Sequence, residues 1–212
     1  MSEIITSTMS LKDSGGDNYY AKLTSGDIPA DRSLVLFGGG TVIETFSGVC
    51  DGSSVTVPSG SYTFENVTGT QQGTTTFADA TGSTIAYTPP TGTKQVIYEF
   101  QFAAVADTTH GVSVMQLLLD GTVVANARST LRHGASYADQ GFLFFRWVFA
   151  IGGSADTDTG RVASWSSAKT IKLQYGEHSS SYPAALHLTR NTVNSGTISA
   201  LRRPTLSITA IG

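Results

Sequence analysis

The sequence predicts an all-β protein, and three observations carry this prediction. Only 14% of the 212 residues are charged, and Thr, Ser and 23 Gly, which favour strands and turns, take the place of charged residues. In most segments apolar residues recur with a period of two, which puts alternate side chains on opposite faces of a sheet. We find no periodicity of an amphipathic helix. The spacing of the expected strands favours a jelly-roll β-sandwich.

The alternation is clearest in residues 95–104. The side chains expected to face the core are Val96, Tyr98, Phe100, Phe102 and Ala104. The polar Gln95, Glu99 and Gln101 fall on the other face. This pattern predicts a half-buried strand.

A hairpin is expected at Asp120-Gly121. Residues 112–119 and 122–124 are apolar runs on either side of this dipeptide. Asp-Gly between two apolar runs predicts a two-residue turn, because both central residues of that turn need a positive φ.

Residues 142–151 form a further strand that is apolar on both faces. Further strands are expected at residues 169–175, 184–189 and 205–211, separated by segments rich in Gly, Ser, Thr and Asp. Their side chains expected to face inward are Ile171, Leu173, Leu186, Leu188, Leu206 and Ile208.

The first part of the chain differs in composition from the rest. It is polar and rich in turn-forming residues, apart from a short apolar run at residues 34–37 that leads into Gly38-Gly39-Gly40. We interpret residues 1–45 as a small N-terminal attachment arm or mini-sheet, and residues 46–212 as the jelly-roll sandwich.

Composition argues against several classes of partner. The net charge of −3 gives nucleic acid no reason to accumulate on the protein. The first residues lack the basic and apolar stretches of a secretory signal, and the longest apolar run, residues 142–151, is about half of a membrane span. The lone Cys50 excludes an internal disulfide. We therefore expect no nucleic-acid binding and no membrane insertion.

We expect no catalytic residue, no cofactor and no metal site. Most Asp residues lie within two residues of a Gly, where they cap turns. Asp156 and Asp158 have the spacing that begins a calcium loop, but no later Glu completes it. The four His are far apart, although His187 offers an alternative, a shared ion on a subunit axis. Cys50 has no recognisable His partner and a nucleophile elbow is absent, so we predict a protein that is not an enzyme.

Self-association is expected instead. A strand that is apolar on both faces needs cover on its outer side, and a chain without helices offers none. The outer face of residues 142–151 carries the candidate oligomer interface, Phe142, Phe144, Arg146 and Val148. Arg146 is expected to reach the rim or to pair with Glu99 across the interface.

Several segments resemble structural proteins of tailed phages and other viruses of marine microbes. The resemblance covers about residues 42–212. It is carried by residues 96–102, 118–122 with Ala127-Arg128, 152–157, 164–174 and 204–212.

That resemblance implies a tumour-necrosis-factor-like jelly roll that forms homotrimers on the virion surface, as a capsid decoration or head fibre. The expected partners are other copies of the chain and, through the N-terminal arm, the major capsid protein or another virion protein. The particle would assemble in the host cytoplasm. The alternative is a receptor-binding tail-fibre tip that holds host surface glycan, with Tyr137, Trp165 and Tyr182 as carbohydrate-binding candidates, beside Tyr19.

Overall fold

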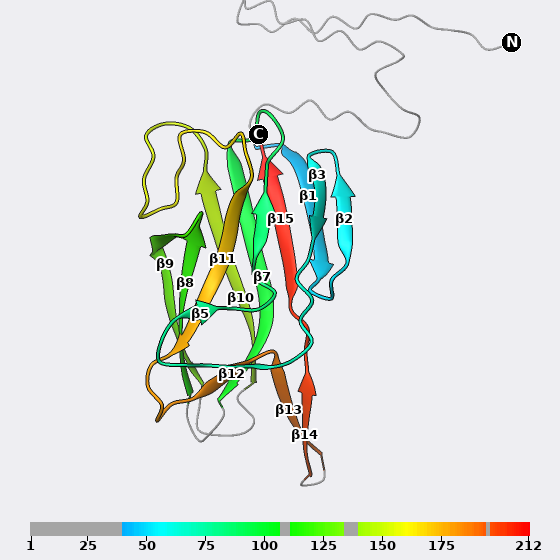
Figure 1. Cartoon of the computed structure of the whole chain (residues 1–212), viewed down its shortest axis with the longest axis vertical. Coiled ribbons are helices and arrows are strands. Elements are labelled where there is room, and N and C mark those ends of the chain that lie inside the picture. Colours follow the sequence, from blue (N-terminus) through cyan, green and yellow to red (C-terminus); the bar gives the residue numbers. More distant parts are fainter. Residues whose placement is uncertain (1–39, 107–110, 134–139, 194–195) are drawn as a thin grey trace, which may run out of the picture. The chain divides into compact units, whose positions relative to one another are not determined.

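The computed structural model describes residues 40–106, 111–133, 140–193 and 196–212. None of these described residues lies in a helix, and no membrane-crossing helix is found among them. They form two antiparallel sheets packed face to face, with two short ribbons attached (Figure 1). The predicted all-β sandwich is confirmed.

The first sheet contains, in spatial order, β1 (Val42–Val49), β15 (Thr205–Ile211), β7 (Gln95–Ala106) and β10 (Gln140–Ala150), with β12 (Ala184–Leu186) and β4 (Gln71–Gln72) at one end of β7. The second contains β9 (Thr122–His133), β8 (Gly111–Leu119) and β11 (Lys169–Glu177), followed by β5 (Ala78–Asp79) and β6 (Ile85–Tyr87), which share the far edge of β11. The ribbons are β2 (Ser54–Val57) with β3 (Gly60–Thr63), and β13 (Leu188–Val193) with β14 (Gly196–Leu201).

The order of the strands is that of a jelly roll. Along the chain the main strands are β1, β6, β7, β8, β9, β10, β11 and β15. The first sheet holds the first, eighth, third and sixth of them, and the second sheet holds the second, seventh, fourth and fifth. Neighbours in each sheet therefore come from distant parts of the sequence, as two interleaved Greek keys require.

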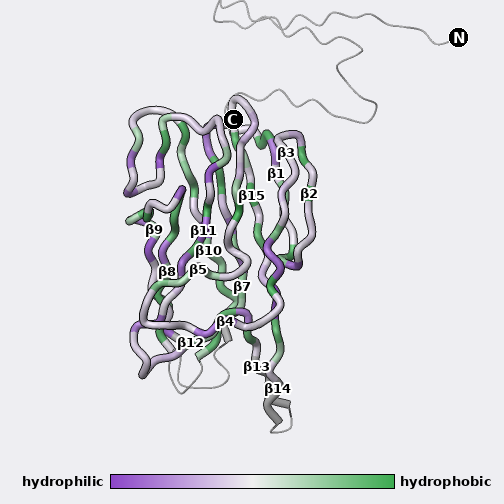
Figure 2. Tube along the Cα trace, in the orientation of Figure 1, coloured by the Kyte–Doolittle hydropathy of each residue, from purple (hydrophilic) through white to green (hydrophobic). Residues whose placement is uncertain are grey.

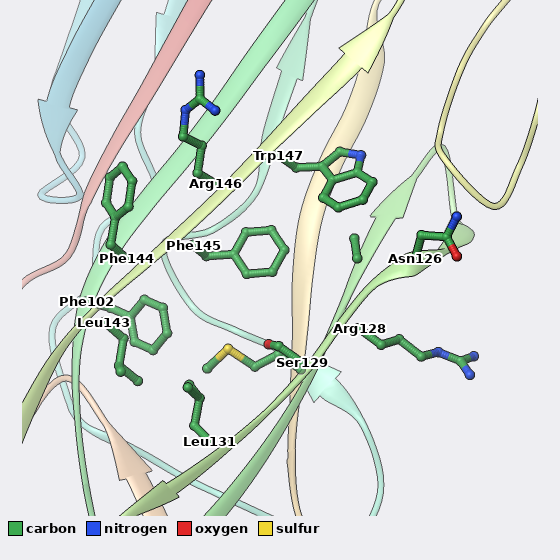
Figure 3. A pocket seen from close by; sticks show the side chains of 12 residues that line it. Phe102, Asn126, Arg128, Ser129, Leu131, Leu143, Phe144, Phe145, Arg146 and Trp147 are labelled. Atoms are coloured by element: carbon green, nitrogen blue, oxygen red, sulfur yellow. The ribbon is translucent and has the colours of Figure 1, made fainter.

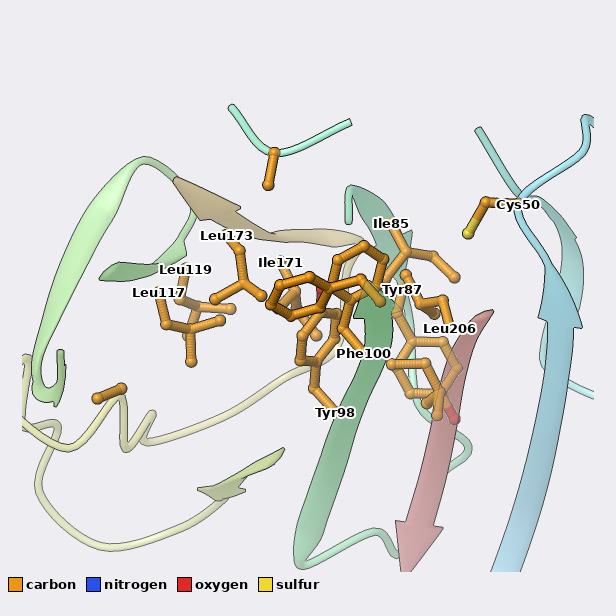
Figure 4. Close-up of a cluster of buried hydrophobic side chains, with 14 of the residues drawn as sticks. Cys50, Ile85, Tyr87, Tyr98, Phe100, Leu117, Leu119, Ile171, Leu173 and Leu206 are labelled. Atoms are coloured by element: carbon orange, nitrogen blue, oxygen red, sulfur yellow. The ribbon is translucent and has the colours of Figure 1, made fainter. Parts of the chain in front are cut away.

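The inward face of β7 is as predicted. Its alternate apolar side chains are almost completely buried, while Gln95 and Gln101 on the other face are exposed. Figure 2 shows the same alternation of apolar and polar residues along the other strands of the sandwich. Across the core, side chains of β7 and β15 meet those of β8 and β11, including Phe100, Leu117 and Leu173 (Figure 4). Burial of these alternate side chains holds the two sheets together.

The turn between β8 and β9 confirms the expected hairpin. Asp120 has φ 49° and Gly121 has φ 79°, the left-handed values that the two-residue turn needs. Asp120 also accepts the backbone N–H of Thr170 and the ammonium of Lys169 at 2.8 Å each, so its side chain ties the turn to β11.

One flank of the sandwich is closed by aromatic rings from the β2–β3 ribbon. Tyr62 stacks on Phe46 with ring centroids 4.9 Å apart and packs at a tilt against Tyr87 at 5.2 Å. Phe64 lies over Gly48, where any side chain would clash with its ring. The flank formed by β1 and β6 is thereby sealed from solvent.

Two buried polar side chains hold this closed flank in register. The Glu44 carboxylate accepts the Ser59 N–H at 3.0 Å, the Ser59 hydroxyl at 2.6 Å and the Tyr87 hydroxyl at 2.9 Å. Ser83, between β5 and β6, takes the place of a paired strand residue beside β11. Its hydroxyl accepts the Leu173 N–H at 3.1 Å and donates to the Leu173 C=O at 3.2 Å. Buried polar groups with all partners in place define a single arrangement.

The segment expected as one strand over residues 184–189 is broken in two at His187. His187 has φ 61°, its N–H donates to Ala103 O at 2.7 Å, and its C=O accepts the Arg202 N–H at 2.8 Å. The positive φ turns the chain out of the first sheet and into the β13–β14 ribbon, which projects beyond the end of the sandwich (Figure 1). Sequence alternation cannot reveal such a corner, because Leu186 and Leu188 keep the apolar period on both sides of it.

The His187 ring is fully buried and packs at a right angle to the Phe100 ring, with centroids 6.4 Å apart. Burial lowers its pKa to about 4. A core position explains this residue, so the alternative of a shared metal axis at His187 is wrong for the fold as described.

The strand β1 begins at Val42, inside the segment that we expected to form the N-terminal arm. Residues 1–39 lie outside the described part of the chain, so an attachment arm over residues 1–45 stays a prediction.

Replacing Gly121 with Ala should lower the free energy of unfolding by about 1–2 kcal/mol, because a β-carbon disfavours the left-handed backbone. The matched control is Gly69→Ala, at a position with open space and no left-handed φ. Urea denaturation of both variants measures the difference. Equal stability of the two variants would contradict the turn geometry.

The stability of the fold should depend on the protonation of His187. As the pH falls below 6.5, the unfolded chain takes up a proton at this residue while the folded chain stays neutral until about pH 4. Stability should therefore fall by about 3 kcal/mol between these pH values. His187→Asn, which tolerates a positive φ, should remove this part of the pH dependence. Parallel stability curves for the two proteins from pH 4 to 6.5 would refute it.

Candidate self-association surface

The strand β10 is an edge strand with two large apolar side chains in solvent. It pairs along its length with β7, and no described strand lies on its other side. Phe142 is 56% exposed and Phe144 is 61% exposed, while Val148 is partly buried and Arg146 is exposed. All four predicted interface residues therefore lie in one row on the outer face of the first sheet, which we call the β10 outer row.

Beside this row the outer face of the sheet carries few charges. The register aligns Arg146 with Glu99 on β7, Ser207 on β15 and Ser47 on β1. The next row of the same face aligns Val148, Ile97, Thr209 and Thr45. The side chains of these rows on β15 and β1 are short hydroxyl groups.

The guanidinium of Arg146 meets Glu99 in the same chain, with Nε and Oε1 3.1 Å apart. The ion pair that we expected across an interface thus forms without a second copy. Both side chains are substantially exposed, so solvent screening limits its contribution to stability. The pair neutralises the one charged position in the middle of the β10 outer row.

A second arginine covers part of this row. The guanidinium carbon of Arg202 lies 3.8 Å from the centre of the Phe142 ring. A cation over an aromatic face is attracted by the electron density of the ring. Arg202 therefore shields one face of Phe142, and Phe144 is the less shielded of the two rings.

An apolar groove that the sequence did not predict lies on the other side of β10. The two sheets separate between the edge strands β9 and β10 and leave a cavity of about 300 Å³ (Figure 3). Its apolar lining comes from Phe102, Met115, Leu131, Leu143, Phe145 and Trp147. Asn126, Arg128 and Ser129 on β9 line its polar side. Leu131, Leu143, Phe145 and Trp147 are only partly buried, so this flank of the sandwich is open where the opposite flank is closed.

The groove keeps its shape through hydrogen bonds that fix its upper end. Trp147 donates its indole N–H to Thr159 O at 3.0 Å. The Asn126 N–H donates to Asp158 O at 2.9 Å, which ties the irregular part of β9 to the loop after β10. Phe144 and Arg146 also border the groove, but their side chains point to the other face of β10, so the groove and the β10 outer row lie back to back on one strand (Figure 3).

The three carbohydrate-binding candidates do not come together. Trp165 is only 6% exposed, donates its indole N–H to Tyr87 O at 2.9 Å and packs edge-on against Phe149, so it belongs to the core. Tyr182 is 41% exposed and contacts His178. Tyr137 and Tyr19 lie outside the described residues. Trp165 is therefore wrong as a carbohydrate-binding candidate, because its ring is packed inside the sandwich.

The Asp156 carboxylate, which has the spacing that begins a calcium loop, already accepts hydrogen bonds within its own turn. Asp156 Oδ1 accepts the Asp158 N–H at 3.0 Å and Oδ2 accepts the Thr159 hydroxyl at 2.8 Å. The bond from Thr159 lowers the Asp156 pKa. In the part of the chain that the structure describes, no three His, Cys, Asp or Glu side chains gather as a metal site.

Cys50 is buried and donates to Gly82 O at 3.1 Å. Burial raises its pKa to about 12, so the thiol stays protonated at neutral pH and is a poor nucleophile. The groove and the β10 outer row are the apolar features of the described surface.

Comparison with known proteins adds little to this description. No protein-family model matches the chain, and no curated protein matches it. Among solved structures, a chain of infectious bursal disease virus, Gt strain, is similar with 12% sequence identity and a TM-score of 0.34. The match covers 87% of the present chain and 41% of that chain, so the present chain spans less than half of its length.

Proposed function

We propose that this chain is a virion structural protein, a capsid decoration or head fibre, that is displayed on the particle surface as a homotrimer. The observation that carries the proposal is the exposure of Phe142 and Phe144 side by side on an edge strand of a protein with few charges. The viral setting rests on the resemblance of the framework residues to phage structural proteins.

Self-association has a sufficient driving force. Burial of Phe142 and Phe144 would contribute about 1.5–3 kcal/mol for each side chain before the cost of association is deducted. The hydroxyl side chains on β15 and β1 extend the surface, and the Arg146–Glu99 pair is the one charged feature in these rows that association would desolvate. Closed cyclic symmetry then repeats one patch around an axis, and three is the copy number that the resemblance implies.

The role of the remaining chain follows from the same proposal. The sandwich points outward, while the segment before Val42 attaches the subunit to the major capsid protein or another virion protein. A receptor-binding tip is the competing function, but its aromatic candidates are buried, separate or outside the described residues. Nothing in the described surface favours glycan binding over self-association.

Immunogold labelling of intact particles tests the location. Label over the head is the expected result. Label confined to the tail tip, together with binding of the isolated protein to a glycan array, would replace the proposal with the receptor-binding alternative. Absence of the protein from purified particles would overturn both.

Replacing both Phe142 and Phe144 with Ser should raise the dissociation constant of the oligomer at least tenfold, because the apolar area of the contact is lost. The fold should keep its stability, since both rings are exposed. Sedimentation equilibrium measures the first effect and urea denaturation the second. Tyr182→Ser is the control, an exposed aromatic residue away from β10, and should leave association unchanged. An unchanged oligomer in the double variant would exclude the β10 outer row as the interface.

A further inference from the structure

We propose that the open edge of β10 pairs antiparallel with β10 of a second copy, around a two-fold axis at Phe145, so that the first sheets of two subunits form one continuous sheet. This contact goes beyond the proposed function. It uses the backbone edge of β10 and leaves the β10 outer row on the face of the extended sheet.

The backbone groups at this edge can be assigned from the hydrogen bonds at the end of the strand. Ile151 donates its N–H to Lys94 O at 2.8 Å, toward β7, whereas the Ala150 C=O accepts the Val162 N–H at 3.1 Å on the other side. Successive residues of a strand direct their N–H and C=O to opposite sides. The even-numbered residues from 142 to 148 therefore direct theirs away from β7, where no described strand lies.

The strand β10 carries none of the features that protect an edge against strand addition. Its register with β7 runs from Gln140 to Ala150 without a bulge, and its sequence contains no proline. Its one charged side chain, Arg146, already pairs with Glu99 of the same subunit. A long, regular and apolar edge strand is a template for pairing with another chain.

The other edge strand of the open flank is protected. The register of β9 with β8 shifts between Met115 and Leu117, and β9 carries the exposed Arg128 and Arg132. Irregular register and outward charges both oppose edge pairing. The Asn126 N–H of β9 is also already bonded to the loop after β10. The edge available for a second copy is therefore that of β10.

The side chains of β10 complement their own order in reverse, which selects a second copy as the partner. With the axis at Phe145, the residues that face each other across the new edge are Phe142 with Val148, Leu143 with Trp147, Phe144 with Arg146, and Phe145 with its own copy. Aromatic side chains beside aromatic or β-branched ones stabilise antiparallel pairs, and a cation beside an aromatic ring is attracted to it. The inward side chains lie on the groove side of β10 (Figure 3), so the second copy supplies apolar neighbours that this flank lacks.

Neighbouring registers fit less well. An axis at Arg146 would place two guanidinium groups directly opposite each other, and like charges in that position destabilise a strand pair. An axis at Phe144 would set Trp147 against Gly141 and leave the indole ring without a cross-strand neighbour. The axis at Phe145 avoids both.

A cysteine at the axis tests the contact and its register together. The two copies of residue 145 would form a pair with α-carbons about 4.5 Å apart, which a disulfide can bridge. Under mild oxidation Phe145→Cys should therefore give a disulfide-linked dimer. Phe142→Cys, on the same strand, is the matched control, because its two copies would lie about 20 Å apart and should stay unlinked. Cys50 is buried and should not compete.

Proline at an outward-facing position tests the backbone contact separately from the aromatic ring. Phe144→Pro removes an N–H that is directed away from β7, so the hydrogen bonds within the subunit are kept. Phe144→Ser removes the same ring but keeps the N–H. The dissociation constant of the oligomer should be at least tenfold higher for Phe144→Pro than for Phe144→Ser, because each subunit loses a hydrogen bond across the edge. Sedimentation equilibrium measures this difference, and urea denaturation checks that both variants are folded.

The outcomes separate this inference from the proposed function. It is overturned if folded Phe145→Cys stays unlinked, or if Phe142→Cys links in its place, which would show subunits meeting through their outer faces. Equal dissociation constants for Phe144→Pro and Phe144→Ser would also overturn it, and this comparison decides alone if Phe145→Cys does not fold. The proposed association through the β10 outer row is judged by the loss of both exposed rings, so either proposal can fail without the other.

Discussion

A two-sheet sandwich must cover its interior at two flanks. In this structure one flank is covered and the other is open, and the rest of the molecule depends on that difference. The sheets bury their facing sides against each other, but at each flank the interior would meet water. On the β1 and β6 side the β2–β3 ribbon lays Tyr62 and Phe64 over the opening, and Glu44 holds the ribbon in place. On the β9 and β10 side nothing equivalent follows in the described chain, and a groove of about 300 Å³ remains.

This asymmetry connects the fold with association. The sealed flank carries the extra segments of the jelly roll, including the short β5 and the exposed Phe77. The open flank carries the longest edge strands, and long exposed edges are a hazard unless a partner covers them. The strand β10 has exposed rings on one face and an open groove on the other. Two uncovered apolar surfaces therefore lie along the same strand. A single neighbouring subunit can cover both.

The regular parts of the fold were predictable from the sequence because side-chain alternation and turn chemistry act locally. The strand at residues 95–104, the turn at Asp120-Gly121 and the strand at residues 205–211 all follow from these rules. Residues whose role depends on distant parts of the chain were not predictable. Trp165 is in a polar segment yet fills the core, His187 breaks an unbroken apolar period, and the groove depends on the separation of β9 from β10. The exposed row Phe142, Phe144, Arg146 and Val148 was identified because the apolar pattern of its strand exceeds what one sheet face can bury.

The scarcity of ionic contacts affects how the protein responds to its medium. Three ion pairs occur among the described residues, and each includes a partly exposed partner. Added electrolyte weakens attractions of this kind, while buried rings and backbone ladders are far less sensitive to it. The subunit fold should therefore keep nearly the same resistance to denaturation from dilute buffer to brine. A sandwich that owes so little of its cohesion to charge should be affected less by a change of salinity than a fold held together by surface ion pairs.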